Sequence, residues 1–472
     1  MEHAKRLKPA WLVAWREIKD QFRDWRIVIP IIALTIFFPF LMNFTAQRML
    51  SFVEEYGATI IAERLVPFLL MIVGFFPISM SLIIALESFV GEKERLSIEP
   101  LLNSPLLDWQ LYIGKLTSSL MLPLFSSYLG MGVYITGLIT KGISIPEPSL
   151  LILIFVLTTT QALVMVSGAV VVSSHATSVR AANLLASMII IPSALLIQGE
   201  SIVMFWGDYQ SLWLVVFGLS LLSILLSRVG LAHFVREELL GREIDALNIR
   251  WGWMLFKKQF IGSHTNLISW YKQEILGTLK SMKTPIILVL ILGIAGIFVG
   301  HFLVREFYVD LGNLSMIEIK DQLKIIESVL PLFEIRPVFS IFWHNLRVLL
   351  LSIILGILSL GIFGVLLFVT SMSVVGYLYT LLNLNHFPMF VYIVLLLPHA
   401  IIEIPAIIIS VAAVLKLGAR LATPETDQTI TEVLIESFAD WTQLTLGLSL
   451  PLLLLSAFIE IWVTPRLAIY LF

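Results

Sequence analysis

Long apolar stretches recur along the chain, and they constrain its fold more than any other feature. A stretch of about 18 or more apolar residues is long enough to cross a bilayer as a helix. Helices are expected because a backbone inside a bilayer must satisfy its own hydrogen bonds. Such stretches lie at residues 27–44, 65–90, 111–138, 150–174, 182–199, 211–231, 285–304, 345–383, 388–415 and 443–465. The pattern predicts an all-α, polytopic integral membrane protein.

The stretch at 345–383 is too long for one crossing of about 20 residues. It also contains four glycines, at positions 356, 361, 364 and 376. We interpret it as one bent helix with a re-entrant piece, or as two short crossings. The prediction is therefore 10–11 transmembrane helices, accompanied by amphipathic interface helices.

The composition excludes several classes of protein. Of the 472 residues, 58% are hydrophobic and 14% are charged, whereas about a quarter are charged in soluble domains. A net charge of −2 provides no basic surface for nucleic acid. The chain has no cysteine, which excludes disulfides and thiolate metal sites, and no His-Glu-x-x-His string. We therefore expect no nucleic-acid partner, no metal site and no catalytic residue.

The polar stretch at 232–284 separates two groups of crossings. We predict a six-helix domain over 1–235, a linker with an interface helix over 236–284, and a second membrane domain of four or five crossings over 285–472. Basic residues gather near the N-terminus and in the linker, which predicts that both lie on the cytoplasmic side of the cell membrane. Beyond residue 345 the orientation stays open, because the loop expected after Leu415 carries both signs of charge.

Interface helices are expected at two similar segments, Trp15–Pro30 and Trp270–Pro285. Both begin with Trp, alternate basic and apolar residues, and end at a proline that enters a crossing. Such a helix lies flat in the headgroup region.

The segment from Gly91 to Lys115 connects two crossings but is more patterned than a simple loop. It contains a short run of apolar residues with charged neighbours, bounded by Pro100 and by Ser104-Pro105. Such a helix suits docking into a groove of a soluble partner. The alternative is a loop helix that folds back on its own bundle. The expected docking residues are Glu92, Glu94, Arg95, Ser97, Glu99, Leu101 and Leu102.

This segment, "ESFVGEKERLSIEPLLNSPLLDWQLYIGKL", resembles the signature of ATP-binding-cassette (ABC) type-2 export permeases. The resemblance covers about residues 10–245. It implies a dimer of six-helix permease domains that moves a substrate outward and binds a separate ABC ATPase subunit. The chain has no G-x-x-x-x-G-K-[S/T] string, so ATP and Mg²⁺ are expected on the partner, with no cofactor in this chain.

Ionisable residues also lie inside the apolar stretches of the second half. His399 and Glu403 are four residues apart and share one helix face, and Glu460 lies in the last stretch. A charged side chain at the bilayer centre costs about 2.5–3.5 kcal/mol on insertion scales, so these groups should face protein or water. A hydrogen-bonded pair that locks helices together, and a site that handles protons or cations, both remain open.

Residues 275–470 resemble stage II sporulation protein M. The resemblance rests on "IFWHNLRV", which contains Asn345, on "PHAIIEIPAI", on Leu417-Gly418 and on "AFIEIWVTP". Ala400 stands where that family usually has glycine. The resemblance implies work in the cell envelope. The polar residues expected to matter within the membrane are His399, Glu403, Glu460 and Asn345.

Two alternatives to a permease follow from the same residues. One is a membrane scaffold that signals to envelope enzymes without transport. The other, more remote, is an intramembrane protease of the prenyl-protease type. Glu237-Glu238 with Arg242, and Phe260 with His264, match two motifs of that class but lie in the polar linker. The substrate of a transporter does not follow from the sequence.

Overall fold

The computed structural model describes residues 2–56, 59–94, 104–175, 182, 187–207, 209–232, 249–262, 266–305, 307–310, 335–423 and 428–471. Within these ranges every regular element is a helix. The helices form two compact units, Met1–Leu247 (unit 1) and Asn248–Phe472 (unit 2). Each unit has its own core.

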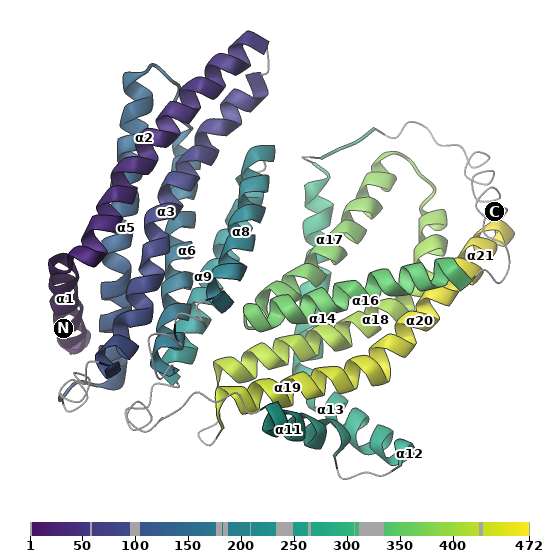
Figure 1. The fold of residues 1–472 in the computed structure, drawn as a ribbon. Coiled ribbons are helices and arrows are strands. Elements are labelled where there is room, and N and C mark those ends of the chain that lie inside the picture. Colours follow the sequence, from purple (N-terminus) through teal and green to yellow (C-terminus); the bar gives the residue numbers. More distant parts are fainter. Residues whose placement is uncertain are drawn as a thin grey trace. The chain divides into compact units, whose positions relative to one another are not determined.

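Unit 1 is a bundle of long helices with an amphipathic helix at one end (Figure 1). Its helices are α1 (Glu2–Arg23), α2 (Trp25–Tyr56), α3 (Thr59–Glu94), α5 (Asp108–Thr140), α6 (Pro148–His175), α8 (Ser187–Trp206) and α9 (Tyr209–Ala232). The central helix is α3, which packs against α2, α5 and α6. Its buried Leu82 and Phe89 form one cluster with Leu111 of α5 and Val166 of α6.

Polar side chains join these helices at their contacts. Ser173 Oγ of α6 donates a hydrogen bond to the carbonyl oxygen of Leu86 in α3, at 2.6 Å. Ser127 Oγ of α5 donates a hydrogen bond to the carbonyl oxygen of Gly74 in α3, also at 2.6 Å. Lipid is as apolar as leucine, so close packing and such interhelical hydrogen bonds, rather than hydrophobic burial, drive helix association in membranes.

Unit 2 has its own helical core. Its elements are α11 (Ile249–Ile261), α12 (Leu267–Trp270), η1 (Tyr271–Ile275), α13 (Leu276–Ser281), α14 (Lys283–Leu303), α16 (Ile335–Leu358), α17 (Ile362–Leu384), α18 (Met389–Ala422), α19 (Ile430–Leu444), η2 (Thr445–Ser449), α20 (Leu450–Phe458), η3 (Ile459–Val463) and α21 (Thr464–Leu471). The three η elements are π-helical turns. Helices α16, α18 and α20 contact one another and run side by side in Figure 1.

Ten helical segments in the described ranges are long and apolar enough to cross a membrane, which confirms the predicted fold class. Five lie in unit 1 (α2, α3, α5, α6 and α9). In unit 2 they are α14, α16, α17, α18 and the continuous segment Thr431–Leu471. The stretch predicted as a crossing at 182–199 corresponds to α8, which runs from Ser187 to Trp206 and is not among the ten.

The stretch at 345–383 belongs to two crossing-length helices, α16 and α17, so the interpretation as two crossings is confirmed and the re-entrant piece is wrong. The crossings are not short, because α16 begins at Ile335, ahead of the stretch, and the two helices have 24 and 23 residues. The break falls at Leu360 and Gly361, whose φ angles are 52° and 90°. Glycine adopts a left-handed φ without steric cost, which allows the chain to reverse here within a few residues.

The loop expected after Leu415 begins later than predicted, because Lys416 and Arg420 lie in helix α18. α18 continues to Ala422, and Arg420 of α18 pairs with Glu436 of α19 at 2.9 Å. Lys416 likewise lies 3.7 Å from Asp440 of α19. The mixed charges that made this loop ambiguous therefore join two neighbouring helices.

The polar linker holds more structure than the sequence indicated. Helix α11 was not predicted, and it packs against α19. Gln443 of α19 donates to the carbonyl oxygens of Gln259 and Phe260, both at 2.8 Å. The interface helix expected over 270–285 is divided among α12, η1, α13 and the start of α14.

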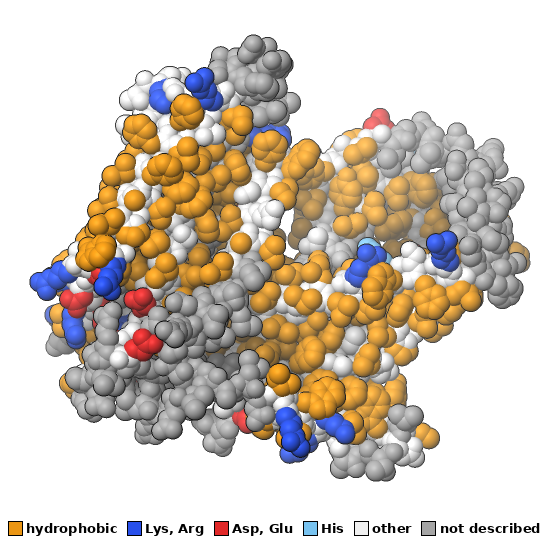
Figure 2. All heavy atoms as spheres, in the orientation of Figure 1, with side chains coloured by type: hydrophobic (Ala, Val, Ile, Leu, Met, Phe, Trp, Pro, Cys, Tyr) orange, Lys and Arg blue, Asp and Glu red, His pale blue; other side chains and the backbone are white. Residues whose placement is uncertain are grey.

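Hydrophobic side chains dominate the surface as well as the core. On the face shown in Figure 2, they cover the lengths of the helices, and the blue and red side chains of unit 1 lie toward its two ends. Examples of exposed large apolar side chains are Phe40, Phe125, Phe217, Ile224, Phe298 and Ile401. Such a surface suits contact with acyl chains rather than water.

Candidate functional site

Lys115 is a fully buried cation at the end of unit 1 where α3 ends and α5 begins. Its Nζ lies 2.6 Å from the carbonyl oxygen of Ser88, 3.1 Å from Glu92 Oε2 and 3.4 Å from Glu17 Oε1. The same ammonium lies over the Phe89 ring, 5.1 Å from its centroid. Lys115 of α5 is therefore tied by opposite charge to both α1 and α3.

The residue before this lysine explains how α1 comes so close. A Cβ atom on Gly114 would lie 2.8 Å from Val13 Cβ and 2.9 Å from the carbonyl oxygen of Ala10. Only glycine leaves room for the α1 backbone at this contact. The Gly-Lys dipeptide thus has two roles, since the glycine admits α1 and the lysine binds its Glu17.

Helix α1 is amphipathic, as expected of an interface helix, but it spans Glu2–Arg23 rather than Trp15–Pro30, and residues 25–30 belong to α2. It buries Ala14 and Ile18 against the bundle and leaves the rings of Trp11 and Trp15 half exposed. Lys19 Nζ lies 5.6 Å from the Trp15 ring centroid. Exposed tryptophan next to lysine is typical of a helix at a membrane interface.

The predicted docking segment begins directly beyond the Lys115 ion pairs. Glu92 and Glu94 form the last turn of α3, and the Glu92 side chain is 21% exposed. The other predicted docking residues lie outside the described residues; they are Arg95, Ser97, Glu99, Leu101 and Leu102. The described residues begin again at Ser104. At the start of α5, the Gln110 side chain accepts a hydrogen bond from the backbone N–H of Leu107.

A cavity of about 250 Å³ lies beside the same ion pairs. Its walls come from α1, α3 and the first turns of α5, and its charged lining residues are Arg16, Glu17, Asp20, Asp24, Glu87 and Glu92. Lys115 neutralises part of the charge of Glu17 and Glu92, and Arg16 lies 4.0 Å from Asp20, but five carboxylates against two cations still leave this hollow acidic. It is suited to basic side chains of a partner.

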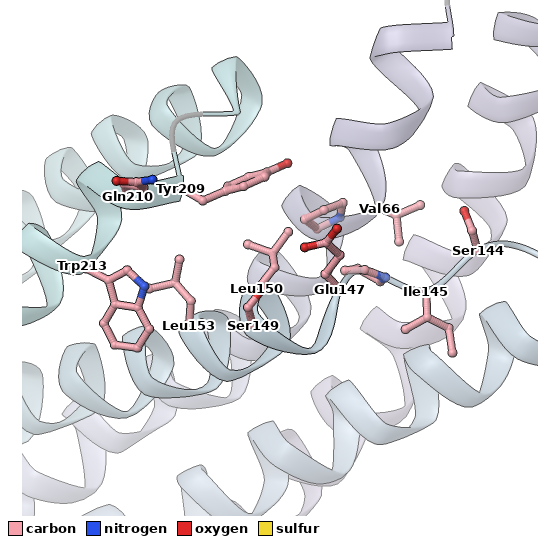
Figure 3. A pocket seen from close by; sticks show the side chains of 12 residues that line it. Val66, Ser144, Ile145, Glu147, Ser149, Leu150, Leu153, Tyr209, Gln210 and Trp213 are labelled. Atoms are coloured by element: carbon pink, nitrogen blue, oxygen red, sulfur yellow. The ribbon is translucent and has the colours of Figure 1, made fainter. Parts of the chain in front are cut away.

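A second cavity of about 460 Å³ lies at the opposite end of α3. Its lining combines apolar residues with polar ones and comes from the start of α3, the connection before α6, the first turns of α6 and the start of α9. In Figure 3 the Tyr209 ring extends from α9 toward the carboxylate of Glu147, and Trp213 and Leu153 form the apolar wall. The mixed lining suits an amphiphilic molecule.

In unit 2 the structure brings together all four polar residues that the sequence singled out. Ligand atoms of His399, Glu403 and Glu460 lie within 4.8 Å of one another. Asn345 Nδ2 of α16 donates to Glu403 Oε1 at 3.2 Å, and Ser456 Oγ of α20 donates to Glu403 Oε2 at 3.0 Å. The role of these residues stays a prediction, but their proximity is now a structural fact.

Helix spacing explains how Glu460 reaches this group. Glu460 follows Ser456 by four residues, so both face the same side of the helix, and Ser456 contacts Glu403. Glu460 itself lies at the start of the π-helical turn η3, between α20 and α21. His399 and Glu403 are likewise four residues apart, on one face of α18.

Some buried charges were missed by sequence reasoning. Glu17 was not expected to pair with Lys115, which lies 98 residues further along the chain. Glu200 of α8 is buried and accepts a hydrogen bond from Gln161 of α6. The available signal was a charged residue inside or next to an apolar stretch, which applied to Lys115 and Glu200 as it did to Glu403.

The motifs of the protease alternative do not form a site in the described residues. Glu237, Glu238, Arg242 and His264 lie outside those residues, and Phe260 is near the end of α11. The Phe260 ring instead packs against Phe256 and Trp270.

Comparisons with known proteins agree with the division into two parts. A family model described as "ABC-2 family transporter protein" matches residues 11–205, and one described as "Stage II sporulation protein M" matches residues 286–465. An uncharacterized protein of Methanocaldococcus jannaschii is 31% identical over 190 residues, which are 40% of this chain and 99% of that protein. No solved structure matches the chain.

Proposed function

We propose that the chain is the permease subunit of an exporter driven by a separate ABC ATPase. The proposal rests on the family models that match residues 11–205 (ABC-2 family transporter protein) and residues 286–465 (Stage II sporulation protein M). The family places a permease-type component in the membrane. The partner ATPase, the outward direction and the cytoplasmic position of the N-terminus belong to the proposal.

One observation supports this function above the others. The Lys115 ion pairs join α1, α3 and α5 at the base of the segment from Arg95 to Leu102. A partner that binds this segment and moves would pull on α3 and α5 directly, and on α1 through Glu17. Such a linkage is what an ATPase needs to convert nucleotide hydrolysis into movement of transmembrane helices.

The apolar and the charged residues of the predicted docking segment have different roles in binding the ATPase. Leu101 and Leu102 anchor the contact, because buried apolar side chains at the centre of an interface carry most of its affinity. Glu94, Arg95 and Glu99, which precede the two leucines in the sequence, steer the encounter. The acidic hollow lined by Asp20, Asp24 and Glu87 adds an attraction for basic residues of the ATPase.

The proposed substrate is amphiphilic. The cavity near Trp213 and Glu147 lies at the end of α3 farthest from the docking segment, which is the outer side in this orientation. Its apolar wall and single carboxylate fit a lipid-like or hydrophobic peptide substrate. Two such domains, from a second copy or a related chain, would complete the pathway.

The decisive experiment tests the docking segment. Leu101→Asp should abolish co-purification of the ATPase, because a carboxylate would have to be buried in its apolar groove, while the permease remains in the membrane. The matched control is Leu101→Met, which keeps the volume and apolar character and should retain the complex.

Full retention of the ATPase by Leu101→Asp would overturn the docking role. An assay in vesicles that contain the intact complex distinguishes export from the scaffold alternative. ATP hydrolysis with outward movement of labelled lipid supports export, whereas hydrolysis that moves no substrate favours the scaffold alternative.

A further inference from the structure

Unit 2 contains a group of side chains whose composition and geometry match a metal site. His399, Glu403 and Glu460 each offer one ligand atom, and the three atoms lie within 4.8 Å of one another. We propose that they bind a divalent transition-metal ion, Zn²⁺ in particular. The sequence singled out these three residues and left cation handling open, but it predicted no metal site, because the ligands come from two distant segments and follow no short motif.

The separation of the ligand atoms is close to what an ion requires. An ion at the centre of a triangle with sides of 4.8 Å would lie about 2.8 Å from each corner, whereas zinc binds nitrogen and oxygen at about 2.0–2.2 Å. Each ligand atom therefore has to move by less than about 1 Å, which small side-chain rotations provide. One imidazole and two carboxylates form a nitrogen and oxygen set that zinc accepts.

The charges of the group favour a bound cation. Within the described part of the chain, no lysine or arginine forms an ion pair with Glu403 or Glu460. Arg347 lines the same hollow, but its Nε donates to the carbonyl oxygen of Trp343. Two neighbouring carboxylates repel each other inside a helix bundle, and a divalent ion would neutralise both.

His399 supplies an independent observation. Its Nδ1 atom is buried and has no hydrogen-bond partner among the residues that the structure describes. A buried ring nitrogen without a partner carries a desolvation cost, and histidine is the commonest metal ligand in proteins. Coordination of an ion by Nδ1 would give this buried nitrogen a partner.

Neighbouring groups hold the ligands in place. Asn345 and Ser456 each donate to one oxygen of Glu403, and both oxygens keep a further lone pair for an ion. Such hydrogen bonds to a ligand typically contribute 10- to 100-fold in metal affinity. Asn345 and Ser456 are therefore positioning residues, and they join α16 and α20 to the ligands on α18.

The surroundings leave room for further ligands of the ion. A cavity of about 390 Å³ is lined by the three ligands together with Ser340, Ile341, His344, Asn345 and Arg347. The space admits water or a small anion to an open coordination position, as in zinc sites that keep one exchangeable ligand.

The test measures metal in the purified full-length protein. After treatment with a chelator and addition of Zn²⁺, desalted protein should retain about one ion per chain by mass spectrometry, as expected for a single site. Its unfolding temperature should rise with Zn²⁺ because the ion binds only the folded state. Mg²⁺ in place of Zn²⁺ should have a much smaller effect, because Mg²⁺ demands octahedral oxygen ligation.

Variants assign the binding to this group. His399→Gln and Glu460→Gln should each lose the retained ion, and Asn345→Ala should weaken Zn²⁺ binding about 10- to 100-fold. The matched control is His301→Gln, which alters another histidine of unit 2, one that contacts Thr380 instead. It should keep the ion.

Three results would overturn the proposal. They are wild-type protein that retains no Zn²⁺, retention that is unchanged in His399→Gln and Glu460→Gln, and an equal loss in His301→Gln. If a ligand variant fails to fold, the Zn²⁺ affinities of wild type and Asn345→Ala can still be compared by competition with a chelator dye. Equal affinities would contradict the site, and a weaker variant would support it.

Discussion

At the scale of single residues, the strongest constraint in unit 1 is the charge of Lys115. Its ammonium is fully buried, and its two carboxylate partners are themselves only about one-fifth exposed. Removing one member of a buried pair leaves an uncompensated charge and costs about 3–5 kcal/mol. Here the lower end applies, because Glu17 and Glu92 retain some contact with water.

Lys115→Met should therefore destabilise unit 1 by about 3 kcal/mol, measured as the free energy of unfolding in detergent. Adding Glu17→Gln and Glu92→Gln to this variant should recover part of the loss, because no buried charge is then left unpaired. Lys141→Met is the control, since that lysine is exposed at the other end of α5. A similar loss in Lys141→Met would show that the effect is not due to the ion pairs.

At the scale of elements, unit 2 depends on a close contact between α14 and α17. A Cβ atom on Gly376 would lie 2.0 Å from the carbonyl oxygen of Ile297, and one on Gly300 would lie 1.9 Å from that of Ser373. The opposing atoms belong to the backbone, so they cannot rotate away. Small residues at such contacts let transmembrane helices approach closely.

Gly376→Val should force α14 and α17 apart and lower the stability of unit 2 by about 1–3 kcal/mol or more, the range of overpacked cores. The measurement is the unfolding temperature of the purified protein. Gly132→Val in α5 is the control, because a Cβ there meets nothing within 4 Å. Equal effects of the two changes would contradict a role for the close contact.

At the scale of the whole molecule, the chain consists of two compact units, each with its own buried cluster. We expect each unit to fold without the other. A protease site inserted near residue 240 should allow cleavage into two fragments that both stay in the membrane with unchanged helix content by circular dichroism. Loss of helix in either fragment after cleavage would show that the units depend on each other.

The sequence predicted the spans well, because a bilayer requires about 20 apolar residues and the chain shows this signal repeatedly. It did not predict where the stretch at 345–383 divides, since the break depends on the backbone of Leu360 and Gly361. It also missed α11, whose aromatic residues gain stability only by packing on α19.

The candidate sites were predictable to different degrees. The cost of charge in a membrane singled out His399, Glu403 and Glu460, and a family resemblance added Asn345. Their mutual distances depend on how α18 packs against the last helical segment, which no local pattern reveals. The pairing of Glu17 with Lys115 was beyond reach for the same reason, because the two residues meet only after α1 folds onto α5.

The position of Lys115 also bears on the order in which the protein enters the membrane. A lysine in an inserting helix costs up to about 2.5–3.5 kcal/mol at the bilayer centre, and less near a helix end. Both carboxylate partners of Lys115 precede it in the chain, so they have left the ribosome before α5 reaches the insertion machinery. Glu17 and Glu92 are thus synthesised before Lys115. A circular permutant that places α1 after α9 would reverse this order for Glu17, and α5 should then insert less efficiently.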